Sequence, residues 1–292
     1  MIGLFGAGGF LGRHTQKALR EKGLQFRAYT RHDADITKPV ELKALDAKPT
    51  VVVNLAARVP AKGVPASDMM RINAEGAVRI CEWAIERGAK HFVYGSTLSV
   101  VARPWPVPLR EEEIAYPRAL KGNAQAALYA ASKLAGEIAC RALCEEAGVT
   151  FSALRFSALY GEEMTWQGVM PLFIDMALDG RVPKVNAGGQ VFADFLHARC
   201  AANAVVAACQ TSAEGIFNIA SGDERSILEL AQICLASAGR CEAVLVDNEG
   251  EASRALIDTA RMRIELCSIP QVTLEEGVAK LMQWRRENAP SA

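Results

Sequence analysis

The chain of 292 residues carries 33 basic and 33 acidic residues, and half of its residues are apolar. A formal net charge of zero argues against electrostatic binding of nucleic acid or of an anionic membrane surface. No apolar run approaches the roughly 20 residues that cross a bilayer, and no basic stretch of an export signal is visible at the N-terminus. The length suffices for one large domain with a smaller lobe.

The eight cysteines are scattered along the chain, with no Cys-x-x-Cys pair and few histidines near them. Cys140 and Cys144 lie one helical turn apart, but two thiols without further ligands are more typical of helix packing than of a zinc site. We therefore expect no metal. The pattern favours reduced thiols in a cytoplasmic protein.

The first twelve residues predict a strand, a tight turn and the start of a helix. An apolar run ends at Phe5, glycines follow at Gly6, Gly9 and Gly12, and an amphipathic segment covers 10–22. Such a turn leaves backbone N–H groups and the positive end of the helix facing a phosphate. The spacing is G-x-x-G-x-x-G, because Leu11 occupies the place of the last glycine in the commoner dinucleotide fingerprint. Taken alone, the turn fits a plain loop equally well.

Strands and helices then alternate. We expect strands at 24–30, 51–57, 91–97 and 150–156, and helices at 40–45, 69–87 and 124–146. The proline-rich and charged stretch 103–122 is expected to form a long surface loop. This alternation is typical of an α/β fold with a Rossmann-type doubly wound parallel sheet, whose ligand lies beyond the carboxyl ends of the strands.

The pattern becomes irregular after Leu159. Helices are expected at 170–178, 199–210, 226–238 and 274–286, and strands at 191–197 and 215–220. We assign residues 1–157 to a dinucleotide-binding core, to which 191–220 are expected to return. Residues 158–190 and 221–292 are expected to form a small C-terminal substrate-binding lobe.

Tyr129 and Lys133 lie at positions i and i+4 of the predicted helix 124–146, and therefore on one face. A fixed cation lowers the pKa of a phenol from about 10, and roughly 4 kcal/mol of such stabilisation would bring it near neutral pH. By itself, the pair fits an exposed helix surface better. However, Thr97 ends a buried strand at the expected ligand edge, where its hydroxyl could share a substrate oxygen with Tyr129. Together with the glycine turn, these residues indicate an active site.

From Ile2 to about Leu230 the chain resembles the extended short-chain dehydrogenases/reductases of the NAD-dependent epimerase/dehydratase family. The motifs that carry the resemblance lie at 6–12, 54–57, 73–76, 92–97, 129–137, 154–156, 160–161 and 217–220. The resemblance implies that Thr97, Tyr129 and Lys133 form a catalytic triad. Tyr129 would act as acid or base on the substrate oxygen, Thr97 would hold that oxygen, and Lys133 would lower the tyrosine pKa and bind the nicotinamide ribose.

The resemblance also implies a nicotinamide dinucleotide bound by Gly6, Gly9, Phe10, Leu11, Gly12, Arg31, Asp35, Ile36, Leu55, Ala56, Ala57, Tyr129, Lys133 and Phe156. Arg31 follows the second strand, where no acid stands directly at the strand end, and a guanidinium suits the 2′-phosphate of NADP better than the ribose of NAD. NADP is therefore favoured over NAD, although Arg31 could equally be a solvated surface residue. Asp35 would accept a hydrogen bond from the adenine. Asn73 matches an asparagine that is either structural or part of a proton relay.

The expected substrate is a nucleotide sugar. Dehydrating relatives carry Asp-Glu after the catalytic hydroxyl residue, and Leu98-Ser99 stand there in this chain. The expected reaction is therefore a hydride transfer, either the reduction of a ketone or a 4-epimerisation. The family's acids after residue 197 are replaced by Ala198, Arg199 and Cys200, which weakens any closer assignment. Alternatives are a reductase of a non-sugar ketone or aldehyde and a non-catalytic dinucleotide sensor. The family also suggests a homodimer formed through long helices, one of them 124–146.

Overall fold

The computed structural model describes residues 1–292 except 62, 119–123, 165–167, 212, 267–270 and 289–292. Cys267 and residues 119–122 of the expected loop 103–122 therefore lie outside the described residues. The described part of that loop consists of turns and irregular backbone, with a single bridge between Leu109 and Ile257.

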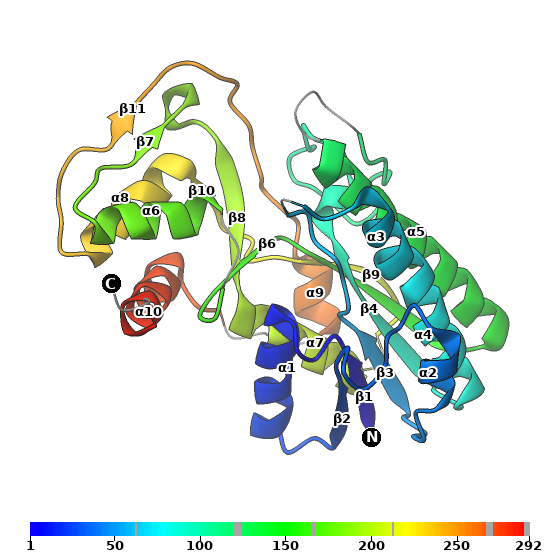
Figure 1. The fold of residues 1–292 in the computed structure, drawn as a ribbon. Helices are drawn as coiled ribbons and strands as arrows, with labels where there is room; N and C mark the ends of the chain where they lie inside the picture. Colours follow the sequence, from blue (N-terminus) through cyan, green and yellow to red (C-terminus); the bar gives the residue numbers. More distant parts are fainter. Residues whose placement is uncertain (62, 119–123, 165–167, 212, 267–270, 289–292) are drawn as a thin grey trace.

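A six-stranded parallel sheet forms the centre of the larger part of the molecule (Figure 1). Its spatial order is β2 (Phe26–Tyr29), β1 (Ile2–Phe5), β3 (Val51–Asn54), β4 (His91–Thr97), β5 (Thr150–Phe156) and β9 (Gly215–Ile219). The chain passes from β1 to β2 on one side and then crosses to β3 on the other side of β1. The strand order therefore reverses between β1 and β3, and sheets of this kind bind their ligands at such a point. The expected doubly wound α/β fold is confirmed.

Alternating side chains of the strands build two apolar layers, because successive residues of a strand face opposite sides. Leu4, Val53 and Val93 pack with α1 (Phe10–Glu21) and α7 (Ala198–Thr211). Their neighbours Phe5, Val52 and Phe92 pack on the other face, with α4 (Gly76–Glu86) and α5 (Ala124–Ala147). Two short helices, α2 (Pro39–Lys43) and α3 (Ala66–Met70), precede a π-helical turn at Arg71–Glu75.

A smaller group of elements lies beside the carboxyl end of the sheet. Its three strands are β10 (Glu224–Ser226), β8 (Phe192–His197) and β6 (Ala158–Tyr160), and α6 (Val169–Leu178), α8 (Ile227–Ser237) and α10 (Leu274–Glu287) pack with them. A short pair, β7 (Lys184–Val185) and β11 (Leu245–Val246), closes one end, and α9 (Ala260–Glu265) returns toward β9 (Figure 1). Within 191–220, α7 and β9 therefore join the large sheet and its helices, whereas β8 belongs to the small sheet.

The carboxylate of Asp194 joins the two sheets. It is 3% exposed and accepts hydrogen bonds from the Ser157 hydroxyl at 2.7 Å, from the Ser221 N–H and hydroxyl at 2.9 and 2.8 Å, and from the Gly222 N–H at 2.8 Å. Ser157 follows β5, and Ser221 follows β9. The small sheet is thus held at the carboxyl edge of the large one. Burial raises the pKa of Asp194.

Among the described residues, no helix has both the length and the apolar character required to cross a membrane.

A buried ion pair anchors α5 to the sheet. Nη2 of Arg155 lies 2.6 Å from Oε1 of Glu137, the hydroxyl of Ser96 donates to the same carboxylate at 2.5 Å, and the two charged side chains are 4% and 5% exposed. Removal of one partner from such a pair leaves an uncompensated buried charge, which costs about 3–5 kcal/mol.

We therefore expect Arg155→Met to lower the free energy of unfolding by about 3–5 kcal/mol in urea denaturation. The double variant Glu137→Leu/Arg155→Met should recover most of this loss, because no unpaired charge remains. Arg141→Met, on the exposed side of the same helix, is the control and should change stability by less than about 0.5 kcal/mol. A loss below 1 kcal/mol in Arg155→Met would contradict the anchoring role.

Candidate active site

The turn after β1 has no room for side chains at two of its glycines. Gly6 has φ of 77°, and a Cβ there would lie 2.4 Å from the nitrogen of Ala56. A Cβ on Gly12 would lie 2.1 Å from the Gly6 carbonyl oxygen. Gly9 is different, because it is exposed and a Cβ would meet only the Gly6 oxygen, at 3.2 Å. Gly6 and Gly12 therefore allow the close packing, and Gly9 keeps the outer side of the turn open.

This turn fits a pyrophosphate. No side chain caps the N-terminus of α1, whose N-cap residue is Gly9, so the positive end of the helix faces outward at the open side of the turn. The N–H of Leu55 donates to Phe5 O at 3.0 Å, which brings 55–57 beside the turn. The buried Asn54 accepts a hydrogen bond from Ala56 N–H at 3.0 Å and shapes this segment.

The end of β2 carries both a cation and an acid. Arg31 is exposed, and no hydrogen bond or ion pair to another described residue holds its guanidinium. Asp33 folds back on Thr30, whose N–H and hydroxyl both donate to its carboxylate at 2.7 Å, and these hydrogen bonds lower its pKa. Asp33 stands four residues beyond the end of β2 and was therefore not among the expected cofactor residues. The turn that returns it to Thr30 is a common property of Asp.

The two residues expected at the adenine have local partners. The carboxylate of Asp35 accepts from the N–H and hydroxyl of Thr37 at 2.9 and 2.8 Å. Ile36 packs on Gly76: a Cβ added to Gly76 would lie 2.8 Å from Cδ1 of Ile36. Their roles toward an adenine stay predictions.

Lys133 is buried on the inner face of α5. Its side chain is 2% exposed, and Nζ lies 4.2 Å from the centroid of the Tyr94 ring, which favours the ammonium through a cation–π contact. The Tyr94 hydroxyl donates to Lys133 O at 3.1 Å and to Asn73 O at 3.2 Å. Burial lowers the pKa of Lys133 to about 8, against the opposing charge of Glu137. Tyr94 is thus a contact of Lys133 that helical spacing did not reveal.

The tyrosine pKa differs from the sequence-based expectation. Burial raises the pKa of Tyr129 to about 12, whereas we expected Lys133 to lower it. The physical reason is that the ammonium of Lys133 lies over the Tyr94 ring and desolvation dominates at Tyr129. The phenol is therefore protonated at neutral pH in this structure.

Thr97 ends β4 directly opposite Phe156 of β5. It is 9% exposed, and its hydroxyl oxygen accepts the Ser99 N–H at 3.2 Å, which caps a short 3₁₀ turn at Leu98–Val100. Phe156 is mostly buried and lies near Gly95, where Leu55 also approaches. The edge formed by β1, β3, β4 and β5 thus brings together the glycine turn, Leu55, Thr97 and Phe156.

Asn73 ties the segment after β3 to α5. Its side chain accepts the Arg58 N–H at 2.6 Å and donates to Arg58 O and to the Ser132 hydroxyl, both at 2.9 Å. Ser132 in turn donates to Tyr129 O at 2.7 Å. Of the two alternatives left open by the sequence, these contacts favour the structural role, since Asn73 positions the helix that carries Tyr129 and Lys133.

No group of three or more His, Cys, Asp or Glu side chains within the described ranges is placed to hold a metal ion. Cys140 and Cys144 are fully buried in the layer between α4 and α5, where Sγ of Cys81 lies 3.5 Å from Sγ of Cys144. Their surroundings fit helix packing.

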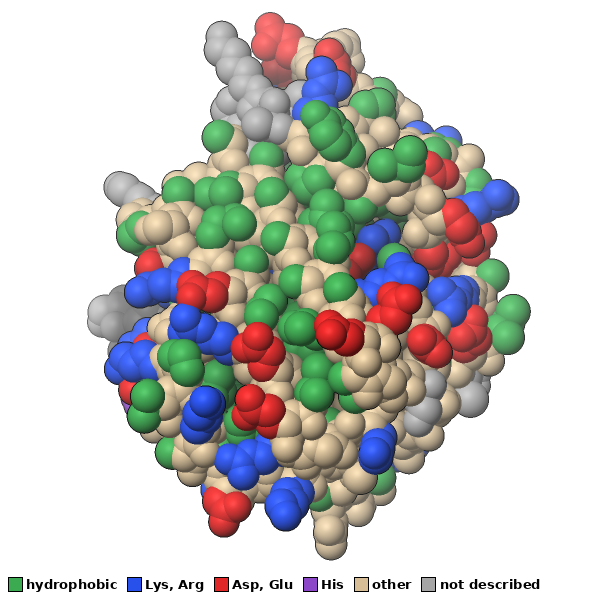
Figure 2. Space-filling view, turned by 90° about the vertical axis from the view of Figure 1, so that its right-hand side faces the viewer, with side chains coloured by type: hydrophobic (Ala, Val, Ile, Leu, Met, Phe, Trp, Pro, Cys, Tyr) green, Lys and Arg blue, Asp and Glu red, His purple; other side chains and the backbone are tan. Residues whose placement is uncertain are grey.

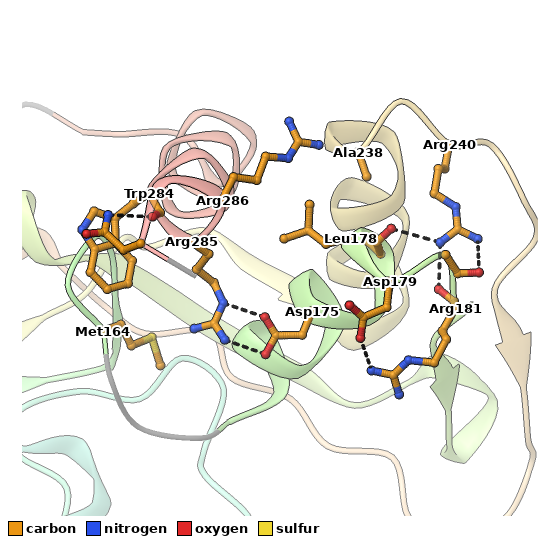
Figure 3. Close-up of a pocket in the computed structure, with 13 residues that line it drawn as sticks. Met164, Asp175, Leu178, Asp179, Arg181, Ala238, Arg240, Trp284, Arg285 and Arg286 are labelled. Carbon is orange, nitrogen blue, oxygen red and sulfur yellow. Dashed lines mark hydrogen bonds and ion pairs between the residues drawn. The ribbon is translucent and has the colours of Figure 1, made fainter. Parts of the chain in front are cut away.

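A hollow lies elsewhere, in the smaller group of elements. It has a volume of about 980 Å³ and is lined by residues of α6, α10 and the end of α8, away from the glycine turn (Figure 3). Arg285 pairs with Asp175 through two contacts of 2.6 and 2.5 Å, and Arg240 donates to the carbonyls of Ala177, Gly180 and Arg181. These two guanidinium groups are therefore already engaged by the protein.

Comparison with known proteins places this geometry in context. The model of the NAD dependent epimerase/dehydratase family matches residues 2–220. The chain is 26% identical over 264 residues to a putative UDP-glucose 4-epimerase of Methanocaldococcus jannaschii, with 88% of this chain and 82% of that protein covered. It is 27% identical over 292 residues to a dTDP-L-rhamnose 4-epimerase of Burkholderia thailandensis, with 86% and 79% covered.

Solved structures agree in fold. UDP-glucose 4-epimerase of Thermotoga maritima with UDP-glucose is similar with a TM-score of 0.83 at 20% identity, covering 99% of both chains. RMD of Pseudomonas aeruginosa with NADPH is similar with a TM-score of 0.81 at 22% identity, covering 98% of this chain and 99% of that chain. At these identities the likeness establishes the fold.

The burial of Lys133 predicts a pH-dependent stability. Its pKa of about 8 lies below the ordinary 10.5. Between these two pH values the lysine is protonated in the unfolded chain and neutral in the folded protein. The free-energy cost of burying the ammonium therefore disappears as the pH rises through this range. The difference corresponds to about 3 kcal/mol. The unfolding free energy of the native protein relative to Lys133→Met should therefore rise by up to about 3 kcal/mol from pH 7.5 to 10.5 in urea denaturation. The same difference for the exposed Lys17→Met should stay flat, and a flat difference for Lys133→Met would contradict the prediction.

Proposed function

Because this chain belongs to the NAD-dependent epimerase/dehydratase family, we propose that it is an NAD(P)-dependent enzyme that transfers a hydride to or from a carbonyl or hydroxyl carbon of a nucleotide sugar. The observation that carries the proposal is the buried ammonium of Lys133, one helical turn from Tyr129. A lysine buried to this degree is rare outside functional sites. The relatives named above as UDP-glucose and dTDP-L-rhamnose 4-epimerases support the nucleotide-sugar substrate.

In the proposed reaction a bound nicotinamide supplies or accepts the hydride. Tyr129 donates its phenolic proton to the substrate oxygen in the reductive direction, and its protonated state at neutral pH suits this role. Thr97 holds the same oxygen by a hydrogen bond. Lys133 is assigned to hold the nicotinamide ribose.

The absence of an Asp-Glu pair after Thr97 favours reduction or 4-epimerisation over elimination of water. Leu98 is 1% exposed and packs in an apolar cluster with Val100 and Leu109, and Ser99 N–H is bonded to Thr97. No carboxylate is therefore offered by the residues that follow the catalytic hydroxyl. A reductase of a non-sugar ketone or aldehyde is the second candidate, since this geometry sets the chemistry and not the substrate. The Tyr129–Lys133 pair argues against a non-catalytic dinucleotide sensor.

We further propose NADP as the preferred cofactor. The exposed Arg31 can bind a 2′-phosphate, whereas Asp33, the acid that could bind a ribose hydroxyl of NAD, already accepts two hydrogen bonds from Thr30. We assign 1–157 to the dinucleotide-binding core, to which 191–220 contribute through α7 and β9. Residues 158–190 and 221–292 are assigned to the substrate-binding lobe, except α9, which packs on β9 of the core.

A homodimer through α5 and α4 is also proposed. Apolar side chains gather along the middle of the molecular face that lies at the right of Figure 1 (Figure 2), and Ile138 of α5 is 61% exposed. No disulfide joins the cysteines of the described ranges, which supports a cytoplasmic location.

Tyr129→Phe removes the proposed acid and keeps the ring. We expect turnover of UDP- or dTDP-sugars, followed at the nicotinamide absorbance, to fall by about 10²–10⁴-fold. Affinity for NADPH, measured by fluorescence, should change less than about threefold. Tyr116→Phe, at an exposed position, is the control and should behave as the native protein. Full activity of Tyr129→Phe would exclude the proposed mechanism.

Arg31→Ala tests the cofactor preference. Loss of a charge-assisted hydrogen bond should reduce the ratio of NADPH to NADH affinity by about 10–100-fold. Asp33→Asn should leave this ratio unchanged or raise it, and Lys22→Ala, an exposed cation at the end of α1, is the control. An unchanged ratio in Arg31→Ala combined with a strong effect of Asp33→Asn would assign the site to NAD.

A further inference from the structure

One side chain connects the glycine turn with the segment 161–164, which follows β6. Arg13 directly follows Gly12, and its Nη1 donates to Gly8 O at 2.7 Å. Its Nε pairs with the carboxylate of Glu163, and its Nη2 donates to Glu163 O at 3.3 Å. Arg13 therefore joins segments that lie 150 residues apart in sequence.

The contact to Gly8 constrains the flexible part of the turn. Gly8 O and Gly9 N–H belong to one peptide group; Arg13 holds the oxygen, and Gly6 O accepts the N–H at 3.0 Å. A turn with glycine on both sides of this peptide has wide conformational freedom in the absence of such contacts. Arg13 thus preorganises the turn that would receive the pyrophosphate, which favours binding by reducing the entropy lost on association.

The partner loop is held in an unusual conformation. Glu163 has φ of 67°, a left-handed value that Ala187 alone shares among the described non-glycine residues. Such backbone persists only where the surroundings impose it. The preceding residue is also fixed: His14 Nε2 donates to Glu162 O at 3.0 Å, and the carboxylate of Glu162 lies 3.1 Å from His197 Nε2. The proximity of His197 lowers the pKa of Glu162 to about 2.

We propose that Arg13 and Glu163 are positioning residues that couple dinucleotide binding at the glycine turn to the conformation of the segment 161–164 after β6. This inference rests on the proposed function, because it assigns the turn to a dinucleotide. The side chains of Arg13 and Glu163 are 39% and 45% exposed, so the pair contributes little to global stability. Its effect lies in the geometry of the turn and of the loop.

Binding of NADPH, measured by fluorescence titration without turnover, tests the coupling. Arg13→Gln should weaken binding by about tenfold and Glu163→Gln by about threefold, and the double variant should bind as Arg13→Gln alone, because the two residues act as one unit. Arg13→Lys retains the charge but cannot make all of the contacts. Its affinity for NADPH should therefore lie between that of the native protein and that of Arg13→Gln. Lys17→Gln, one turn further along α1, is the matched control and should bind as the native protein.

Glu163→Gly separates positioning from stability. It removes the carboxylate and relieves the left-handed strain, so the melting temperature should stay equal or rise while NADPH affinity falls. In hydrogen exchange, NADPH should protect amides 161–164 in the native protein and not in Arg13→Gln. Parallel losses of affinity and melting temperature, or equal affinity in all variants, would overturn the coupling. If the native protein binds neither NADPH nor NADH, the proposed function itself fails.

Discussion

The contact between the turn after β1 and the end of β3 is the constraint on which the rest of the site depends. Gly6 touches the backbone of Leu55 and Ala56 so closely that a methyl group would collide with it, and Gly12 packs on Gly6 and Ala7 in the same way. Because of these contacts, α1 begins at the edge of the sheet, at the point where the strand order reverses. The positive end of the helix and the ends of β3, β4 and β5 consequently face one region.

The inner face of α5 carries the residues to which the proposed chemistry is assigned. Tyr129, Lys133 and Glu137 follow one another at successive helical turns, and Tyr94 and Arg155 of the sheet hold the last two. Burial shifts the pKa of Lys133 down and that of Tyr129 up, which keeps the phenol protonated. Burial therefore sets the protonation states from which the proposed proton transfer would begin.

The smaller sheet is joined to the larger one by polar contacts at its carboxyl edge. Asp194 binds the segments after β5 and β9, and Arg13 links the glycine turn to the loop after β6. Both joints connect elements of the lobe with groups at the proposed cofactor edge. The arginine joint is the more exposed of the two and is therefore the one suited to respond to a ligand.

The sequence by itself determined the alternation of strands and helices, the glycine turn and the spacing of Tyr129 and Lys133, because periodicity and backbone sterics act between near neighbours in the chain. Those features sufficed for the fold class and the family. Only the tertiary structure decided that the ammonium of Lys133 lies over Tyr94, that β8 leaves the large sheet, and that Arg13 meets Glu163. The physical reason is that burial, strand pairing and charge contacts depend on residues distant in sequence, whose relative positions exist only in the folded chain.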